Sequence, residues 1–173
     1  MQQLWERIIL HQPLPTNVKK QPMIFNGIDG QTVEFKITNY QFPDMELGKF
    51  DDDWLLIYLN VKSKLGHWQT IDPSLTTNEI KELIDWFIEL SNDKKPKYNP
   101  IQFIEPNLSF ELLGYTENIY TIRLKFALES KPKSAKDNKD YFVDFEYNKT
   151  KLKQIVVDLT KELNNYPERK GTS

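Results

Sequence analysis

Apolar and polar residues alternate with a period of two along several stretches of the chain, which is the pattern of half-buried β-strands. The clearest stretch spans residues 120–128, where apolar positions alternate with Thr121, Arg123 and Lys125. Similar alternation, or a short apolar run, predicts further strands at 23–25, 33–37, 54–61, 65–71, 101–104, 108–112 and 141–147. The first two of these should form a hairpin, because Asn-Gly and Asp-Gly pairs lie between them.

Two other stretches repeat apolar residues at helical spacing and predict amphipathic helices over 76–91 and 149–165. The first begins with Thr76-Thr77-Asn78-Glu79, which has the form of a capping box. In a capping box the Thr76 hydroxyl accepts from the Glu79 amide, and the Glu79 carboxylate accepts from the backbone of Thr76. Each helix is expected to cover one side of a sheet with its apolar face.

Proline and glycine mark the expected ends of several strands. Pro43 should end the second strand, since proline cannot continue a ladder of backbone hydrogen bonds. Asp72-Pro73-Ser74-Leu75 is expected to break the strand over 65–71, and Gly114-Tyr115 to turn the chain before the strand at 120. The short connections favour antiparallel neighbours, because parallel pairs need long crossovers.

The predicted fold class is α+β: a mainly antiparallel β-sheet covered by two amphipathic helices, in a single domain. Residues 1–22, rich in proline, are expected to form an N-terminal arm, and residues 23–173 the single α+β domain. The sequence does not determine which face of the strand over 54–61 points into the core, because both of its faces carry apolar side chains. The expected core is Phe35, Leu56, Tyr58, Leu83, Phe87, Phe110, Ile122, Leu124, Phe126, Val143, Phe145, Leu152, Ile155 and Leu159.

Composition narrows the classes of function. The 173 residues are 39% hydrophobic and 13% aromatic, which is typical of a folded globular protein, and the net charge of −2 does not favour nucleic acid as a direct partner. There is no cysteine, which excludes thiolate catalysis, disulfides and zinc fingers. No stretch approaches the ~20 apolar residues of a membrane span, and no signal peptide is recognisable. The expected location is the cytoplasm.

Catalytic and cofactor motifs are missing from the sequence. A catalytic triad would have to use His11 or His67, yet no Gly-x-Ser-x-Gly elbow occurs, and His67 is better explained as a half-exposed strand residue. The six glycines do not fall in a phosphate-binding spacing. Glu105, in a turn between two strands, could be a functional acid at the sheet rim or a residue that bonds the turn backbone. We therefore assign no catalytic, cofactor-binding or metal-binding residue and expect no enzyme activity.

An acidic loop follows the second strand and leaves three interpretations open. It could be a solvated loop, a docking patch for a basic partner, or a site for a hard cation, although its three adjacent aspartates do not match a calcium-binding loop. Aromatic residues beside it, Trp54 among them, could anchor a partner. The candidate partner-binding residues are Asp44, Glu46, Asp51, Asp52, Asp53, Tyr40 and Phe42.

A series of short motifs in a fixed order resembles the WapI family of bacterial immunity proteins, over about residues 33–171. The motifs are Asn39-Tyr40-Gln41-Phe42-Pro43, Asp53-Trp54-Leu55, Gly66-His67-Trp68, the segment from Asp72 to Glu79, the segment from Phe103 to Phe110, and Tyr166-Pro167-Glu168-Arg169. The resemblance implies a non-enzymatic cytoplasmic protein that binds and neutralises the C-terminal domain of a wall-associated or contact-dependent toxin. It implies a nuclease toxin, whose phosphate-binding cleft would be basic.

Two other functions are compatible with the residues alone. The many aromatic side chains would suit a small-molecule or scaffold binding domain, which a deep aromatic concavity would favour over a convex acidic patch. A hydrolase that uses carboxylates is a third hypothesis, although no recognised motif pairs two acids.

Overall fold

Strands and helices follow one another in the predicted order. The structure is a computed structural model, and it describes residues 22–44, 53–136 and 138–169. Its helices are α1 (Thr77–Ser91) and α2 (Lys149–Leu163), with short 3-10 helices η1 (Ile28–Gly30) and η2 (Leu128–Ser130). Its strands are β1 (Met23–Asn26), β2 (Thr32–Tyr40), β3 (Trp54–Ser63), β4 (Gly66–Thr76), β5 (Ile101–Gln102), β6 (Leu108–Thr116), β7 (Ile119–Phe126) and β8 (Tyr141–Tyr147).

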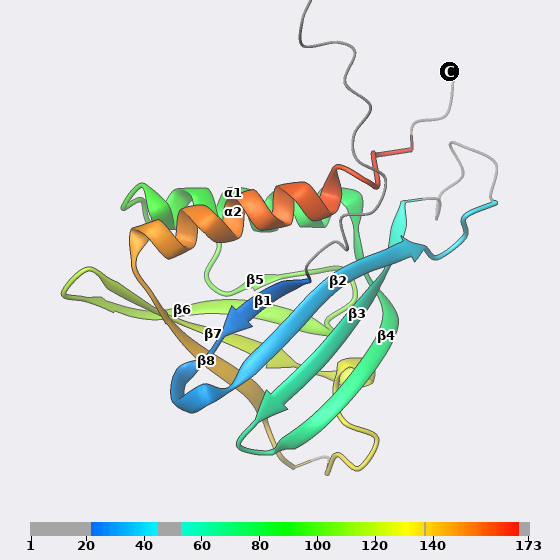
Figure 1. The fold of residues 1–173 in the computed structure, drawn as a ribbon, viewed down its shortest axis with the longest axis horizontal. Helices are drawn as coiled ribbons and strands as arrows, with labels where there is room; N and C mark the ends of the chain where they lie inside the picture. Colours follow the sequence, from blue (N-terminus) through cyan, green and yellow to red (C-terminus); the bar gives the residue numbers. More distant parts are fainter. Residues whose placement is uncertain (1–21, 45–52, 137, 170–173) are drawn as a thin grey trace, which may run out of the picture.

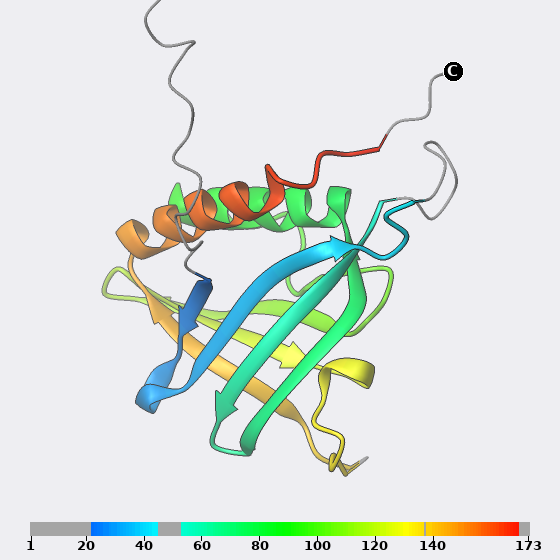
Figure 2. The ribbon, with the colours of Figure 1, turned by 45° about the vertical axis from the view of Figure 1, so that its right-hand side comes forward.

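The strands divide into two four-stranded sheets, in the orders β1-β2-β3-β4 and β5-β6-β7-β8. Every neighbouring pair is antiparallel. The two helices lie side by side and cover one side of the molecule, with both sheets beneath them (Figures 1 and 2). The α+β class is therefore confirmed, with two antiparallel sheets under the helix pair.

One continuous hydrophobic core joins the two sheets and the helices. Phe25 of β1 lies at its centre, where its ring contacts Phe35, Phe87, Phe110 and Phe145, with centroid separations of 5.6–6.5 Å. These partners belong to the first sheet, to α1 and to the second sheet. The sheets also approach closely beside β1: a Cβ at Gly27 would lie only 2.6 Å from Val143 Cγ1 of β8, so glycine is needed there.

Most of the predicted core is buried, but the prediction for β3 was wrong. Leu56 and Tyr58 are half-buried, whereas Leu55, Ile57, Leu59 and Val61 point into the core. Apolar side chains occur on both faces of this strand, so alternation alone could not identify the inner face. The remaining predicted core residues are all buried: Phe35, Leu83, Phe87, Phe110, Ile122, Leu124, Phe126, Val143, Phe145, Leu152, Ile155 and Leu159.

Two expected chain breaks are in fact bulges within longer strands. β4 continues through Pro73 to Thr76, because β4 is an edge strand and its ladder to β3 shifts register between Leu55 and Leu56. β6 continues through Gly114, where its register to β7 also shifts. The chain turns instead at Glu117-Asn118, both with positive φ (52° and 66°), as a two-residue hairpin turn requires.

The helix predictions are confirmed within a few residues. At the start of α1, Thr76 Oγ1 accepts from Glu79 N at 3.2 Å, and Glu79 Oε2 accepts from Thr76 N at 2.9 Å, which completes the predicted capping box. At the start of α2, Asn148 Oδ1 accepts from Lys151 N. These caps fix where each helix begins and therefore where the preceding strand ends.

Candidate functional site

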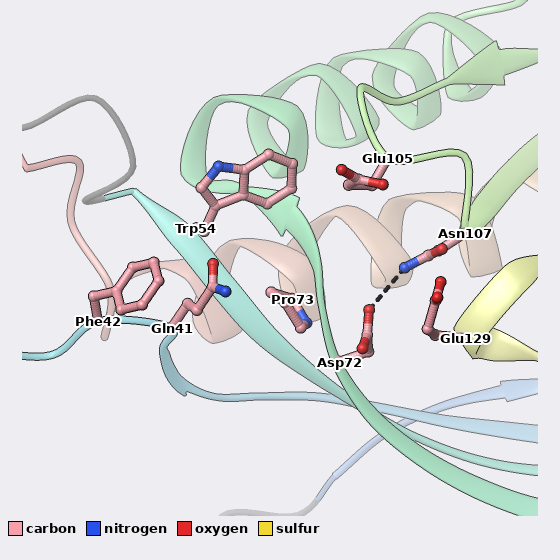
Figure 3. A pocket seen from close by; sticks show the side chains of 8 residues that line it. All are labelled: Gln41, Phe42, Trp54, Asp72, Pro73, Glu105, Asn107 and Glu129. Carbon is pink, nitrogen blue, oxygen red and sulfur yellow. Dashed lines mark hydrogen bonds between the residues drawn. The ribbon is translucent and has the colours of Figure 1, made fainter.

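An open recess of about 450 Å³ lies beside the end of β4 that leads into α1. Connections from both sheets form its walls, and Figure 3 shows their side chains converging on it. We call it the acidic recess. Its lining residues are Gln41, Phe42, Trp54, Asp72, Pro73, Glu105, Asn107 and Glu129.

The β4 bulge builds the floor of the acidic recess. It places Ser74 inside the protein, where the side chain is 1% exposed, while Asp72 and Pro73 line the recess. Asn107 crosses from the β5–β6 connection: its Nδ2 donates to Asp72 Oδ2 at 2.9 Å and to Ser74 Oγ at 3.3 Å (Figure 3 shows the first bond). A kink in an edge strand thus joins the first sheet to a loop of the second.

Glu79, the second residue of the capping box of α1, also positions the loop that carries Glu105 and Asn107. Glu79 is buried, and its Oε1 accepts from Ile104 N at 2.6 Å while its Oε2 caps the helix. From the other side, Asn107 O accepts from Ala127 N at 2.8 Å. The loop is therefore held at both of its ends.

The third wall is η2, which carries Glu129. Trp68 of β4 is buried between Phe126 and Tyr141, and its indole N–H donates to Ser130 O at 2.8 Å. This bond fixes η2 against β4 and brings Glu129 near Asp72.

Like charges meet in the acidic recess. Among the described residues, Asp72, Glu105 and Glu129 are the ionisable ones that line it, and no described lysine or arginine does. The pKa of Asp72 is raised by its partial burial and by repulsion from Glu129 and Glu105, against which the hydrogen bond from Asn107 acts. A cation entering the recess would relieve this repulsion.

The C-terminal segment, residues 164–169, fastens the two stems of the acidic loop beside the recess. The Arg169 guanidinium stacks 3.6 Å over the Tyr40 ring and donates to the carbonyls of Phe42 and Pro43. The Arg169 N–H donates to Asp53 Oδ1 at 2.7 Å on the other stem. Tyr40 itself is 9% exposed and donates from its hydroxyl to Pro167 O.

The structure places the predicted partner-binding residues in different surroundings. Asp44 is exposed and Phe42 is 39% exposed at the rim of the recess. Tyr40 is buried and Asp53 is half-buried, and both are engaged with the C-terminal segment. Glu46, Asp51 and Asp52 lie outside the described residues.

Sequence reasoning missed two of the three acidic members of the recess. In the sequence, Asp72 belongs to an expected strand break and Glu129 belongs to no motif, whereas the turn around Glu105 predicts a possible functional acid at the sheet rim. The lining residues come from five separate segments, so no sequence spacing could join them. Among the residues that the structure describes, no group of three His, Cys, Asp or Glu side chains is arranged to hold a metal ion.

Comparison with models of protein families identifies one family that matches the chain. The family model for the immunity protein WapI-like family matches residues 23–167. The chain belongs to the WapI-like immunity protein family. This confirms the resemblance seen in the motifs, and the match begins at β1, earlier than the motifs indicated. Membership supports an immunity function, and with it a toxin as partner and a non-enzymatic role.

The other comparisons add no relative of this WapI-like protein: neither curated proteins nor solved structures gave a match. In the part of the chain that the structure describes, no helix has the length and apolar character needed to cross a membrane.

Proposed function

We propose that this WapI-like protein binds the C-terminal domain of a cognate toxin in the cytoplasm and neutralises it without catalysing a reaction. We further propose that the toxin is a nuclease with a basic, phosphate-binding cleft. The observation that carries the proposal is the acidic recess at the stem of the acidic loop, on one side of a protein from an immunity family. Complementary charge accelerates association and would block the cleft.

The proposed interface combines the acidic loop with the recess. Phe42 is its exposed aromatic anchor, and Asp44, Glu46, Asp51 and Asp52 provide negative charge. Tyr40 and Asp53 contribute by holding the stems of the loop through Arg169. The C-terminal segment would thus keep these two stems in place before the toxin arrives, which lowers the ordering cost of binding.

The role of the loop is tested by replacing Asp51, Asp52 and Asp53 together with Asn. Asn keeps a side-chain carbonyl that can accept from Arg169 N, so folding should be unchanged. Association with the toxin domain, measured by stopped-flow fluorescence at low and high salt, should slow, and its salt dependence should flatten. The control replaces Glu146, an exposed carboxylate on β8, with Gln. Equal rates and equal salt slopes for parent and triple variant would remove the loop from the mechanism.

The immunity role is tested separately by coexpression with the toxin fragment encoded immediately upstream. The parent protein should restore growth and should be recovered in a complex with the purified toxin domain. Absence of both protection and complex would contradict the proposed function.

The concave shape of the recess favours a second candidate function, the binding of a small cationic molecule. Two aromatic side chains, Phe42 and Trp54, line it. Native mass spectrometry of the purified protein would distinguish the two, because a resident small ligand would add its mass to the chain in the absence of toxin.

A further inference from the structure

We propose that the acidic recess is a receptor for one guanidinium group, supplied by an arginine side chain of the toxin. This inference rests on the proposed function for the source of the arginine. The recess itself can be tested without a toxin.

Charge is the first argument. Three carboxylates converge on the recess, Asp72 from β4, Glu105 from the β5–β6 connection and Glu129 from η2, and none of the described residues that line it is basic. Figure 3 shows Glu105 and Glu129 on either side of the Asn107 tip, with Asp72 below. Glu105 and Glu129 are exposed and Asp72 is half-buried, so a cation can reach all three from the solvent side.

An unsatisfied amide oxygen is the second, independent argument. The Asn107 side chain is 1% exposed and extends into the recess (Figure 3), and its Nδ2 donates to Asp72 and Ser74. Its Oδ1 has no hydrogen-bond partner. Buried polar atoms are nearly always paired. The Asn107 Oδ1 atom is enclosed as well as unpaired, so a guanidinium in the recess would complete its bonding through a small shift of the Asn107 amide towards the bound group.

The aromatic side chains in the walls favour a guanidinium group over an ammonium group. Phe42 and Trp54 present aromatic rings to the same recess. A guanidinium is planar, stacks on aromatic faces and offers five donors, whereas an ammonium is a compact and strongly hydrated charge. The same protein already uses this chemistry nearby, where Arg169 stacks over Tyr40 and donates to two carbonyls.

The direct test is an NMR titration of the full chain with N-acetylarginine amide. The chain has four tryptophans, so the indole N–H signal of Trp54 can be assigned by single replacement. This signal and the Asn107 side-chain amide should move and saturate, and the indole signals of Trp68 and Trp86 should not. N-acetyllysine amide at the same concentration should bind at least about threefold more weakly. No saturation, or equal effects of the two probes, would overturn the proposal.

A double variant, Glu105→Gln with Glu129→Gln, keeps the size and polarity of the walls and removes two charges. It should weaken the affinity for N-acetylarginine amide by about tenfold. The control Glu146→Gln changes an exposed carboxylate on β8 and should leave the affinity unchanged. Equal affinity in the double variant and the parent would contradict the proposal.

The same variants separate this inference from the proposed function. If the parent binds the toxin domain and the double variant binds it about tenfold more weakly, both are supported. If the parent binds and the double variant binds equally well, the receptor role of the recess is wrong while the immunity function stands. If the parent does not bind the toxin, the proposed function fails, and the titration alone decides whether the recess binds guanidinium.

Discussion

The negative charge of Asp72 lowers the stability of the folded protein but favours the proposed binding of a cation. Burial and two neighbouring carboxylates raise its pKa, so its ionised form is less favourable in the folded protein than in the unfolded chain. Because the folded state binds the proton more tightly, this carboxyl favours folding at low pH, and that contribution is lost as the pH rises through its folded pKa. Near neutral pH the charged recess therefore costs stability.

Asp72→Asn should consequently be more stable than the parent at neutral pH, since Asn removes the repulsion and can still accept from Asn107. The gain in melting temperature should shrink as the pH falls through the raised pKa of the folded state, and it should vanish below the ordinary Asp pKa of about 3.8, where the carboxyl is protonated in both states. Thermal unfolding followed by circular dichroism across this range measures it. A variant that is less stable at neutral pH would show that the carboxylate is structural.

Arg169 is expected to contribute about 1 kcal/mol to the stability of the protein through its ring stacking and its two carbonyl contacts. Arg169→Ala should lose this amount in urea unfolding, and Arg169→Lys should recover little, because an ammonium lacks the planar fork. Lys81→Met is the matched control: it removes an exposed ion pair with Glu168 and should cost less than about 0.5 kcal/mol. Equal stability of Arg169→Ala and the parent would mean that the Arg169 side chain contributes nothing measurable to holding the segment.

Little of the recess could be predicted from single residues. Glu105 was noticed because it sits in a charged turn, but Asp72 and Asn107 acquire their roles only when the β4 bulge meets the β5–β6 connection. In the sequence, Tyr40 has the position of a surface anchor, because it precedes an acidic loop. Its burial depends on Tyr166 and Arg169, which lie more than a hundred residues away along the chain.

At the scale of elements, the start of α1 links secondary structure to the site. Glu79 is shared between the helix cap and Ile104 N. Thr76→Ala should cost about 1 kcal/mol, as loss of a cap usually does. Glu79→Ala should cost about 2–3 kcal/mol, because it leaves two backbone donors without their acceptor, one of them beside the recess.

Urea unfolding of both variants tests this difference, and Glu79→Gln provides the control that retains a side-chain acceptor. The Gln variant should lie between the parent and Glu79→Ala. If Thr76→Ala and Glu79→Ala are equally destabilised, the bond to Ile104 contributes nothing measurable.

Helices and strands are predicted well where the sequence pattern is local. They are predicted poorly where a neighbouring strand determines whether the strand continues or which of its faces points into the core. Helical spacing and the capping box identified α1, and alternation identified β7 and β8. Pro73 and Gly114 suggested chain breaks, but an edge position and a bulge accommodate them within strands. The inner face of β3 depends on the sheet that packs against it, which is information that the strand does not carry.

For the whole molecule, Phe25 makes the two sheets and α1 interdependent. Phe25→Ala should cost about 3–5 kcal/mol, because the cavity would open among four other aromatic rings. Unfolding should remain a single transition, with coincident changes in circular dichroism and tryptophan fluorescence. Phe42→Ala, at the surface, should change stability by less than about 0.5 kcal/mol. Two separate transitions in the parent would contradict the shared core.

The exposed position of two acids of the recess affects how the sequences of related proteins can change. Glu105 and Glu129 lie on exposed connections, whereas the aromatic cluster around Phe25 is enclosed. Charges at the rim can therefore be exchanged, one connection at a time, without disturbing the packing that the fold requires. A related protein whose toxin partner has changed could regain binding through substitutions at these rim positions. Among close relatives, the rim should accordingly vary faster than the rings beneath it.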